Sequence, residues 1–260
     1  MTLAISPCPN DAFAFYSLIQ EGHYNVNFLD IEELNRALIA GRYPIAKGSF
    51  AIIDNIAERY EILPTGAAIG KGVGPVFVGT LKNGARVALP GENTTAHRLF
   101  HFWKKFNPEL QITPVQMPFF EMLPSLESGQ VDAAVLIHEG RFIYPAQGLD
   151  LICDLGAFWE EKTGAMIPLG CIYAEKSLPT EVKSAFVASL QDSITKSQTA
   201  YSQKSTLYKE EILPYMRTMA QEKDDHVVEA HVDTYVTEDT FELRSAAHKS
   251  IEVFREAIRP

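Results

Sequence analysis

Short apolar runs alternate with amphipathic stretches through the first two thirds of the chain. Residues 2–6 predict a buried strand, residues 11–20 predict a helix after the prolines that break the chain at 7–10, and residues 26–29 predict the next strand. Such alternation is typical of an α/β fold in which most strands are parallel.

The helix expected after residue 30 has both of its ends marked in the sequence. Asp30 and Glu33 have the spacing of a capping box, and Gly41 is the kind of residue that commonly ends a helix. Its apolar face is formed by Ile31, Leu34 and Leu38.

A helix, a glycine and a buried strand then occur twice, as a weak internal repeat. Gly41 and Gly129 each follow leucine or methionine residues three and seven positions earlier, and each precedes an apolar strand, at residues 44–46 and 131–137. The pattern is common in α/β proteins, so by itself it leaves open whether the chain forms two facing lobes.

Polar residues follow both strands of this repeat. Lys47 and Ser49 end the first strand, and His138 and Glu139 end the second. Because ligands bind at the carboxyl ends of strands in open α/β sheets, we expect two lobes whose strand ends face each other across a cleft.

The apolar segments 73–80 and 167–175 contain proline and glycine and bracket a central section of the chain. We interpret them as paired crossing strands that form a hinge. This predicts a first, discontinuous lobe of residues 1–80 plus 169–260 and an inserted second lobe of residues 81–168, with the ligand cleft between them.

The chain after residue 179 has a helical pattern. Apolar residues recur every four positions from Val182 to Ile194, which gives one face of a long helix. Further helices are expected at residues 207–220, 224–236 and 239–258.

Composition places the chain among ordinary globular proteins. Hydrophobic residues make up 46% and charged residues 22%, and the formal net charge is −10. An acidic chain repels phosphate backbones, so we expect no nucleic-acid partner, and an anionic ligand must be bound by local donors.

The three cysteines, Cys8, Cys153 and Cys171, are odd in number and form no CxxC pair. This argues against a disulfide framework or a zinc knuckle and favours a reducing, cytoplasmic setting. The first residues lack the pattern of a secretory signal, and no apolar run is long enough to span a bilayer, so no membrane association is expected.

The loop from Ser6 to Asp11 joins the first strand to the first helix. Two prolines stiffen it, and Asn10 or Asp11 is placed to cap the helix. It is either a simple cap and turn or a rigid wall of the cleft where a helix N-terminus binds an anion. Cys8 is set aside as a nucleophile because no basic residue lies near it in the sequence.

The segment Lys47, Gly48 and Ser49 is a second candidate binding element. A lysine at a strand end binds a carboxylate, and a glycine lets the backbone approach a ligand closely. The alternative is a solvated lysine before a helix that Ser49 caps.

Residues 91–96 are a third candidate. Asn93 or Thr94 is expected to cap the next helix, and the hydroxyl and N–H groups of Thr94 and Thr95 suit a carboxylate or phosphate. The glycines at 70, 72 and 74 match neither a P-loop nor a dinucleotide fingerprint, so they indicate a flexible crossover loop near the cleft.

His138 is the sharpest candidate for chemistry. It ends a hydrophobic strand, and histidine titrates near neutrality, so it suits proton transfer. Glu139 is placed to orient the imidazole and Arg141 to bind a ligand anion. The alternative is a solvated strand end with a local ion pair.

The other histidines are interpreted as structural. His97 and His101 have a zinc-like spacing, but no third ligand is evident. His226 and His231, with Tyr235, fall on a C-terminal helix and are assigned to packing.

Six motifs in this order give the chain a family resemblance: SPCPNDAFAFY, KGSFA, GKGVGP, NTTA, LIHEGRFIYP and LGAFWEEKTG. Together they resemble the 1,4-dihydroxy-6-naphthoate synthases, lyases of the futalosine route to menaquinone. The resemblance runs from residue 3 to residue 170 and continues more weakly at HVDTYV, residues 231–236.

This resemblance implies the two-lobed clamshell of type II periplasmic binding proteins, with mixed sheets flanked by helices and two crossing hinge strands, used here for catalysis. It implies cyclic dehypoxanthinyl futalosine as substrate, 1,4-dihydroxy-6-naphthoate and dihydroxyacetone as products, and no metal or organic cofactor. The family's proton acceptor falls on His138, its K-x-S segment on residues 47–49, and its threonine pair on Thr94 and Thr95. Gly48 departs from the larger residue common in relatives, which puts the pocket wall there in doubt.

Three other functions remain in competition. A non-catalytic solute-binding protein of the same fold is disfavoured by the absence of a signal pattern and by a histidine in the cleft. The related chorismate dehydratase is disfavoured by the LIHEGRF and NTTA segments. A cytosolic ligand sensor would need an appended signalling segment, for which no residues are spare.

Overall fold

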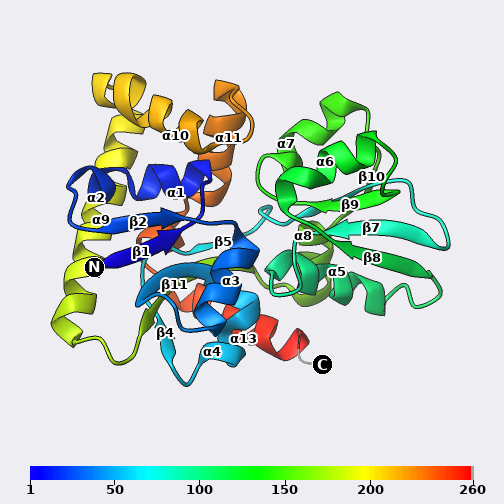
Figure 1. Cartoon of the computed structure of the whole chain (residues 1–260), viewed down its shortest axis with the longest axis horizontal. Helices are drawn as coiled ribbons and strands as arrows, with labels where there is room; N and C mark the ends of the chain where they lie inside the picture. Colours follow the sequence, from blue (N-terminus) through cyan, green and yellow to red (C-terminus); the bar gives the residue numbers. More distant parts are fainter. Residues whose placement is uncertain (259–260) are drawn as a thin grey trace.

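The computed structural model describes residues 1–258, which form two lobes side by side, each built around one sheet (Figure 1). The strands are β1 (Thr2–Ile5), β2 (Asn25–Phe28), β3 (Ile45–Ser49), β4 (Tyr60–Ile62), β5 (Ala68–Gly70), β6 (Val76–Gly79), β7 (Ala85–Leu89), β8 (Ile112–Gln116), β9 (Ala133–Leu136), β10 (Leu151–Asp154) and β11 (Ile167–Glu175). The first lobe contains the sheet β2-β1-β3-β11-β4, in which β5 also pairs with β11, and the second lobe contains the sheet β10-β6-β9-β7-β8.

Helices cover both sheets. The second lobe carries α5 (Thr95–Lys105), α6 (Phe119–Glu127), α7 (Gly140–Ile143) and α8 (Leu155–Thr163). The first lobe carries α1 (Pro9–Ala14), α2 (Tyr16–Gln20), α3 (Ile31–Ile39), α4 (Ile53–Ile56), α9 (Thr180–Ser202), α10 (Leu213–Met219), α11 (Asp225–Tyr235), α12 (Glu238–Phe241) and α13 (Ser245–Ala257). Short helices of other types occupy Phe50–Ile52, Tyr144–Gln147 and Tyr208–Ile212.

The α/β clamshell with mixed sheets that the resemblance implied is the observed architecture, although the alternation of strands and helices alone predicted mostly parallel strands. In the first sheet β3 runs parallel to β1 and antiparallel to β11, and in the second sheet β9 runs parallel to β7 and antiparallel to β6. The alternation of strands and helices predicted the parallel pairs. It did not reveal the strands that enter a sheet without an intervening helix.

Most expected helices are present, but two of them are each divided into two shorter helices. The capping box of α3 is formed, because Glu32 N–H donates to Asp30 and Asp30 N–H donates to Glu33. The helix expected at 11–20 is divided at Phe15 into α1 and α2, and the one expected at 239–258 is divided into α12 and α13. None of the helices described in residues 1–258 combines the length and the apolar character needed to cross a bilayer.

The predicted pairing of segments 73–80 and 167–175 is wrong. The partner of β11 at this place is β5, whereas β6 belongs to the second sheet, where it pairs with β9 and β10. Both segments are equally apolar, so their composition does not indicate which partner each one takes. The division into residues 1–80 plus 169–260 and 81–168 stays a prediction, and we propose that the first crossing lies earlier, at residues 71–75.

The first crossing contains a close contact between two backbones. A Cβ atom on Gly74 would lie 2.2 Å from the Cα of Gly156, which is in the first turn of α8. Val73 and Pro75, on either side of Gly74, line the pocket described below. The absence of a side chain at position 74 therefore allows the backbone of this crossing to approach the backbone of α8 closely.

We expect Gly74→Ala to lower the free energy of unfolding by about 2–3 kcal/mol, because two backbones must separate to admit one methyl group. Gly72→Ala is the matched control, since its position has open space and only a left-handed φ of 69° to strain. That variant should lose about 1 kcal/mol. Urea denaturation measures both, and equal losses would contradict the packing role of Gly74.

Candidate active site

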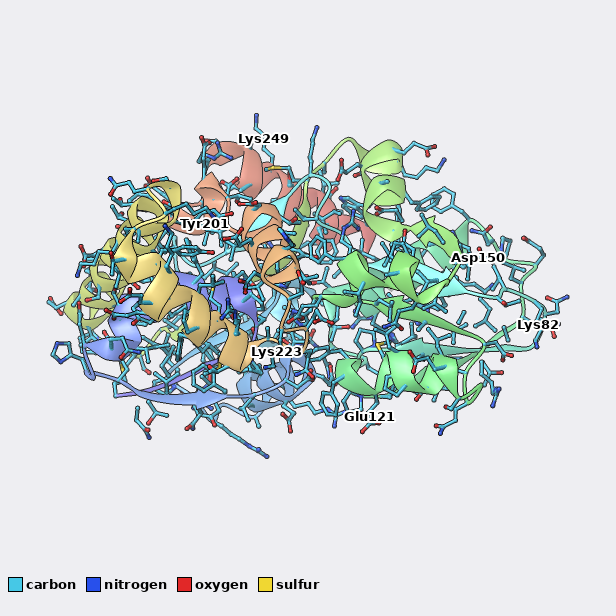
Figure 2. The ribbon with its side chains drawn as sticks, turned by 90° about the horizontal axis from the view of Figure 1, so that it is seen from above. Lys82, Glu121, Asp150, Tyr201, Lys223 and Lys249 are labelled. Carbon is cyan, nitrogen blue, oxygen red and sulfur yellow. The ribbon has the colours of Figure 1, made fainter. Side chains whose placement is uncertain are left out.

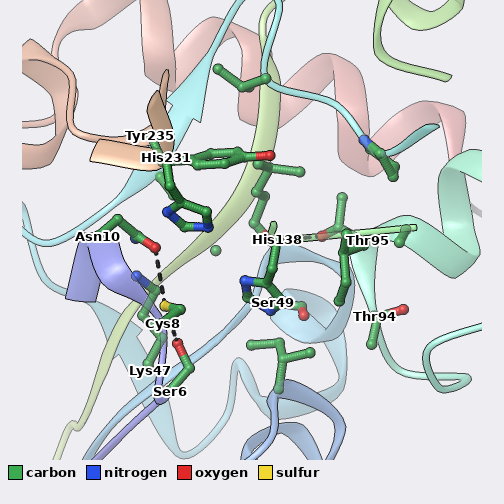
Figure 3. A pocket seen from close by; sticks show the side chains of 18 residues that line it. Ser6, Cys8, Asn10, Lys47, Ser49, Thr94, Thr95, His138, His231 and Tyr235 are labelled. Carbon is green, nitrogen blue, oxygen red and sulfur yellow. Dashed lines mark hydrogen bonds between the residues drawn. The ribbon is translucent and has the colours of Figure 1, made fainter. Parts of the chain in front are cut away.

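A pocket lies between the two lobes and holds about 640 Å³, counting the space open to solvent at its mouth, which suits a small organic molecule (Figure 3). Residues from both lobes line it, and most of its walls are apolar. The lining residues are Ser6, Cys8, Asn10, Ile31, Lys47, Ser49, Ala68, Val73, Pro75, Thr94, Thr95, Ala96, Ile137, His138, Leu169, Gly170, His231 and Tyr235.

A buried ion pair forms one side of the pocket. Lys47, in the middle of β3, pairs with the Asp11 carboxylate, which also accepts a hydrogen bond of 2.6 Å from the Ser6 hydroxyl. Burial alone would lower the pKa of Lys47, but Asp11 together with smaller contributions from Cys8 and Cys171 raises it overall, so the lysine remains a cation. Asp11 lies behind Lys47 and is not part of the lining, in contrast to the substrate contact expected of it.

Ser49 and Gly48 point to opposite faces of β3, as neighbouring residues on a strand must. The Ser49 oxygen accepts a 2.9 Å hydrogen bond from Asn35, so its own hydroxyl proton is available to a ligand. Gly48 faces the core, where a Cβ would lie 2.5 Å from Leu38 and 3.1 Å from the Tyr173 ring. Gly48 is not among the lining residues, so its contact with a ligand stays a prediction, and a glycine here does not loosen the pocket wall.

The N-terminus of α5 forms the facing wall. Thr94 caps this helix by accepting from His97 N–H at 3.1 Å, and its hydroxyl donates to the Gly91 carbonyl. The Thr95 hydroxyl donates to the Leu169 carbonyl at 2.8 Å, so it ties α5 to β11. The N–H groups of Thr95 and Ala96, at the start of α5, have no acceptor four residues earlier in the helix and can bind an anion.

His138 follows β9 in a left-handed backbone conformation, with φ of 51°. Such a conformation is uncommon for a residue other than glycine and is often found at functional sites. Its ring lies 4.7 Å from that of Phe119. Burial lowers the pKa of His138 to about 4, so the imidazole is neutral at pH 7 and has a lone pair to accept a proton.

The two charged residues near His138 in the sequence, Glu139 and Arg141, have hydrogen-bond partners other than those expected. Glu139 does not orient the imidazole, because its carboxylate accepts from Gln221 N–H of the first lobe at 3.0 Å. Arg141 is outside the pocket lining. The chain turns into α7 and directs Arg141 to the Gly74 carbonyl and to Asp154, at 2.5 and 2.8 Å. The anion contact expected of Arg141 stays a prediction, and in this structure the side chain links α7 to Gly74 of the first crossing and to Asp154.

His231 and Tyr235 line the pocket, although the sequence interpretation assigned them to packing. They are four positions apart, so they lie on one face of α11. The weak HVDTYV similarity was the signal that could have identified them. Cys8 also lines the pocket, but burial raises the pKa of its thiol well above the usual value, which leaves it protonated.

One group of side chains within the described residues has the composition of a metal site. His138, Glu139 and His231 each place a possible ligand atom within 4.8 Å of the others. A metal bound there would occupy the lone pair that His138 needs to accept a proton, so the two roles exclude each other.

The second histidine pair noted in the sequence, His97 and His101, lies on α5. Their rings are 4.4 Å apart, and burial lowers the pKa of His97 to about 4.

Several hydrogen bonds join the lobes beside the pocket. Glu32 of α3 accepts from the backbone and side-chain N–H groups of Asn93 in the second lobe, at 3.0 and 2.7 Å. The Thr95–Leu169 bond described above also crosses between the lobes, and Gln221 N–H donates to Glu139. Figure 2 shows Lys223, in the same connection between α10 and α11, at the junction of the lobes, far from Lys82 at the outer end of the second lobe. These contacts link the two lobes beside the pocket.

Comparison with known proteins shows the family of the chain. The profile of the family described as menaquinone biosynthesis matches residues 1–260. A 1,4-dihydroxy-6-naphthoate synthase of Thermus thermophilus is 38% identical over 270 residues, which cover 99% of this chain and 93% of the relative. The enzyme of the same name from Streptomyces coelicolor is 33% identical over 261 residues, with coverage of 96% and 90%.

Solved structures show the same fold. A protein of Archaeoglobus fulgidus superposes with a TM-score of 0.89 at 27% identity, over 98% of this chain and 95% of that one. The alkanesulfonate-binding protein of Xanthomonas axonopodis superposes with a TM-score of 0.66 at 11% identity, over 90% and 83%. At that identity the second likeness shows the periplasmic-binding-protein fold and nothing more of function.

Proposed function

Because the chain belongs to the menaquinone biosynthesis family, we propose that its pocket converts cyclic dehypoxanthinyl futalosine to 1,4-dihydroxy-6-naphthoate and dihydroxyacetone. The chain is an enzyme, a carbon–carbon lyase, as are its relatives of that name. The observation that carries the proposal is the neutral imidazole of His138 facing Lys47 and Ser49 in one pocket between the lobes.

The reaction needs a base, an orienting site and protection from water. Formation of the naphthalene ring starts with removal of a proton from a carbon next to an electron-withdrawing centre, and His138 accepts that proton. Cleavage of the carbon–carbon bond follows and is driven by aromatisation. The apolar walls hold the ring system and exclude water, so orientation by the closed lobes supplies much of the rate enhancement.

We place the substrate carboxylate on the side of the pocket opposite the apolar walls. Lys47 makes one contact with Asp11, which leaves its remaining N–H donors for a ligand, and the Ser49 hydroxyl proton is also free. The first turn of α5, at Thr95 and Ala96, adds backbone donors from the second lobe. A carboxylate bound by both lobes favours their closure.

Asn10 contributes to the shape of the same side of the pocket. Its side-chain oxygen accepts from the Cys8 thiol at 3.0 Å, and its amide donates to Asp11 at 3.2 Å. These bonds fix the loop after β1, so Asn10 supports Lys47 and borders the substrate. We also place the enzyme in the cytoplasm, because Cys8, Cys153 and Cys171 are all free thiols.

The direct test is incubation of the purified protein with cyclic dehypoxanthinyl futalosine, with product formation followed by absorbance and identified by mass spectrometry. Release of naphthoate and dihydroxyacetone in equal amounts is the expected result. Tight binding of the substrate without turnover would instead support a solute-binding protein of the same fold. Turnover of chorismate would support the related dehydratase.

We expect Glu32→Ala to raise KM about 10-fold with little change in kcat, because two hydrogen bonds to a carboxylate that holds the lobes closed are lost. Glu58→Ala, at an exposed position of the same lobe, is the control. Steady-state kinetics and calorimetric titration with naphthoate measure the effect. An unchanged KM in Glu32→Ala would show that the Glu32–Asn93 contact does not contribute to closure.

A further inference from the structure

His231 is a buried imidazole without a partner. Its side chain lies on α11 with 1% of the residue exposed, and neither ring nitrogen has a hydrogen-bonding partner among the described residues. A buried polar group left unpaired costs about 1–3 kcal/mol, so such groups are rare in the interior of a protein. Because the ring lines the pocket, the missing partner is a group that enters the pocket.

The position of this ring relative to His138 indicates what that group is. The two imidazoles are nearly parallel, with 12° between their planes and 6.0 Å between their centres. Their nearest ligand atoms are within 4.8 Å of each other. One reacting group of the substrate can therefore contact both rings, with a C–H bond at one imidazole and the neighbouring carbonyl oxygen at the other.

We propose that His231 donates a hydrogen bond to the substrate oxygen that becomes negative when His138 removes the proton. This inference rests on the proposed function and adds a second residue to its chemistry. In this step the C–H bond breaks, the proton moves to a nitrogen of His138, and the electron pair is delocalised onto the neighbouring carbonyl oxygen. That oxygen, now an enolate, accepts the N–H of His231.

The surroundings of His231 suit a neutral donor. Burial lowers its pKa well below the usual value, and His138 and Lys47 lower it further, so the ring carries one N–H at pH 7. The Tyr235 ring packs at 4.5 Å and the Phe142 ring at 6.1 Å, which fixes its orientation. A donor held in place before the reaction stabilises a developing charge without reorganisation.

The main test is to replace His231 by phenylalanine and by glutamine. Loss of one donor to an oxyanion typically costs about 10²–10³ in kcat, so we expect His231→Phe to lose that much. His231→Gln keeps an N–H group and should lose only about 10-fold. His226→Gln, at an exposed position of the same helix, should be unchanged. KM should change less than kcat in every variant, because the contact strengthens as charge develops.

A substrate deuterated at the reacting carbon separates a chemical role from a structural one. If His231 stabilises the enolate, proton removal becomes slower in His231→Phe, and the isotope effect on kcat increases. A structural role would lower the melting temperature or the fraction of active protein and leave the isotope effect unchanged. Turnover of folded His231→Phe within threefold of the parent enzyme would overturn the proposal.

A measurement on the unmodified enzyme decides the matter even if His231→Phe does not fold. In ¹⁵N NMR with naphthoate bound, the N–H resonance of His231 should shift strongly downfield as it meets the product oxygen. No shift at His231 while the pocket is filled would refute the proposal. Failure of the proposed function is recognised separately, because the parent enzyme would then release no naphthoate.

Discussion

Replacement of His138 by asparagine should reduce kcat by about 10³-fold or more while the protein remains folded. A positioned general base contributes about 10²–10⁴ to a rate, and the asparagine amide cannot accept a proton at neutral pH. Asparagine is the informative substitution because it tolerates the left-handed φ of 51° at this position. His138→Ala should be equally inactive and still bind ligand, but it adds about 1 kcal/mol of backbone strain.

His23→Asn provides the control, because that side chain is exposed and outside the pocket. The pH profile adds a second criterion. Since burial lowers the pKa of His138 to about 4, the base is neutral above that value, and activity of the parent enzyme should fall only as the pH approaches it. Residual activity of His138→Asn should not follow this acid limb. Undiminished product formation by the variant would refute the assignment of the base.

The parts of the site at or just after the ends of strands were predictable from the sequence. The helix, glycine and strand that occur twice pointed to Lys47 and Ser49 in the last part of β3 and to His138 just after β9, and the structure brings all three to one pocket. Ligands bind at the carboxyl ends of strands in open α/β sheets, and here strand ends from the two sheets border the same pocket. The repeat carried this information even though its individual residues differ.

The differences from expectation concern the direction of side chains and the partners of strands. Gly48 was next to two pocket residues in sequence but faces the core because side chains alternate along a strand. Arg141 is three residues from His138, yet the turn into α7 directs it to Gly74 and Asp154. Neighbours in sequence therefore share a site only where the local backbone directs them to the same side.

His231 was missed for a different reason. It belongs to a helix near the C-terminus, and its apolar neighbours are those of any packed helix. Only tertiary structure brings it opposite His138, from a part of the chain 93 positions away in the sequence. The unpaired ring nitrogens that distinguish it from a core histidine are a property of the folded state and have no sequence pattern.

The largest effect on stability is expected at Lys47. Removal of one partner from a buried ion pair leaves an uncompensated charge and typically costs about 3–5 kcal/mol. In Lys47→Met the Asp11 carboxylate would keep only the hydrogen bonds from Ser6 and Asn10. We therefore expect a loss of that size in the free energy of unfolding at pH 7, measured by urea denaturation.

The double variant Asp11→Asn/Lys47→Met separates the stability role of Lys47 from its binding role. Because it contains no unpaired charge, it should recover most of the stability lost in Lys47→Met, since a buried ion pair contributes little beyond the neutral residues that replace it. It should nevertheless bind naphthoate at least about 10-fold more weakly, because the cationic donor for the carboxylate is absent. If the double variant binds naphthoate as tightly as the parent enzyme, the carboxylate lies elsewhere, and Lys47 serves only to neutralise Asp11.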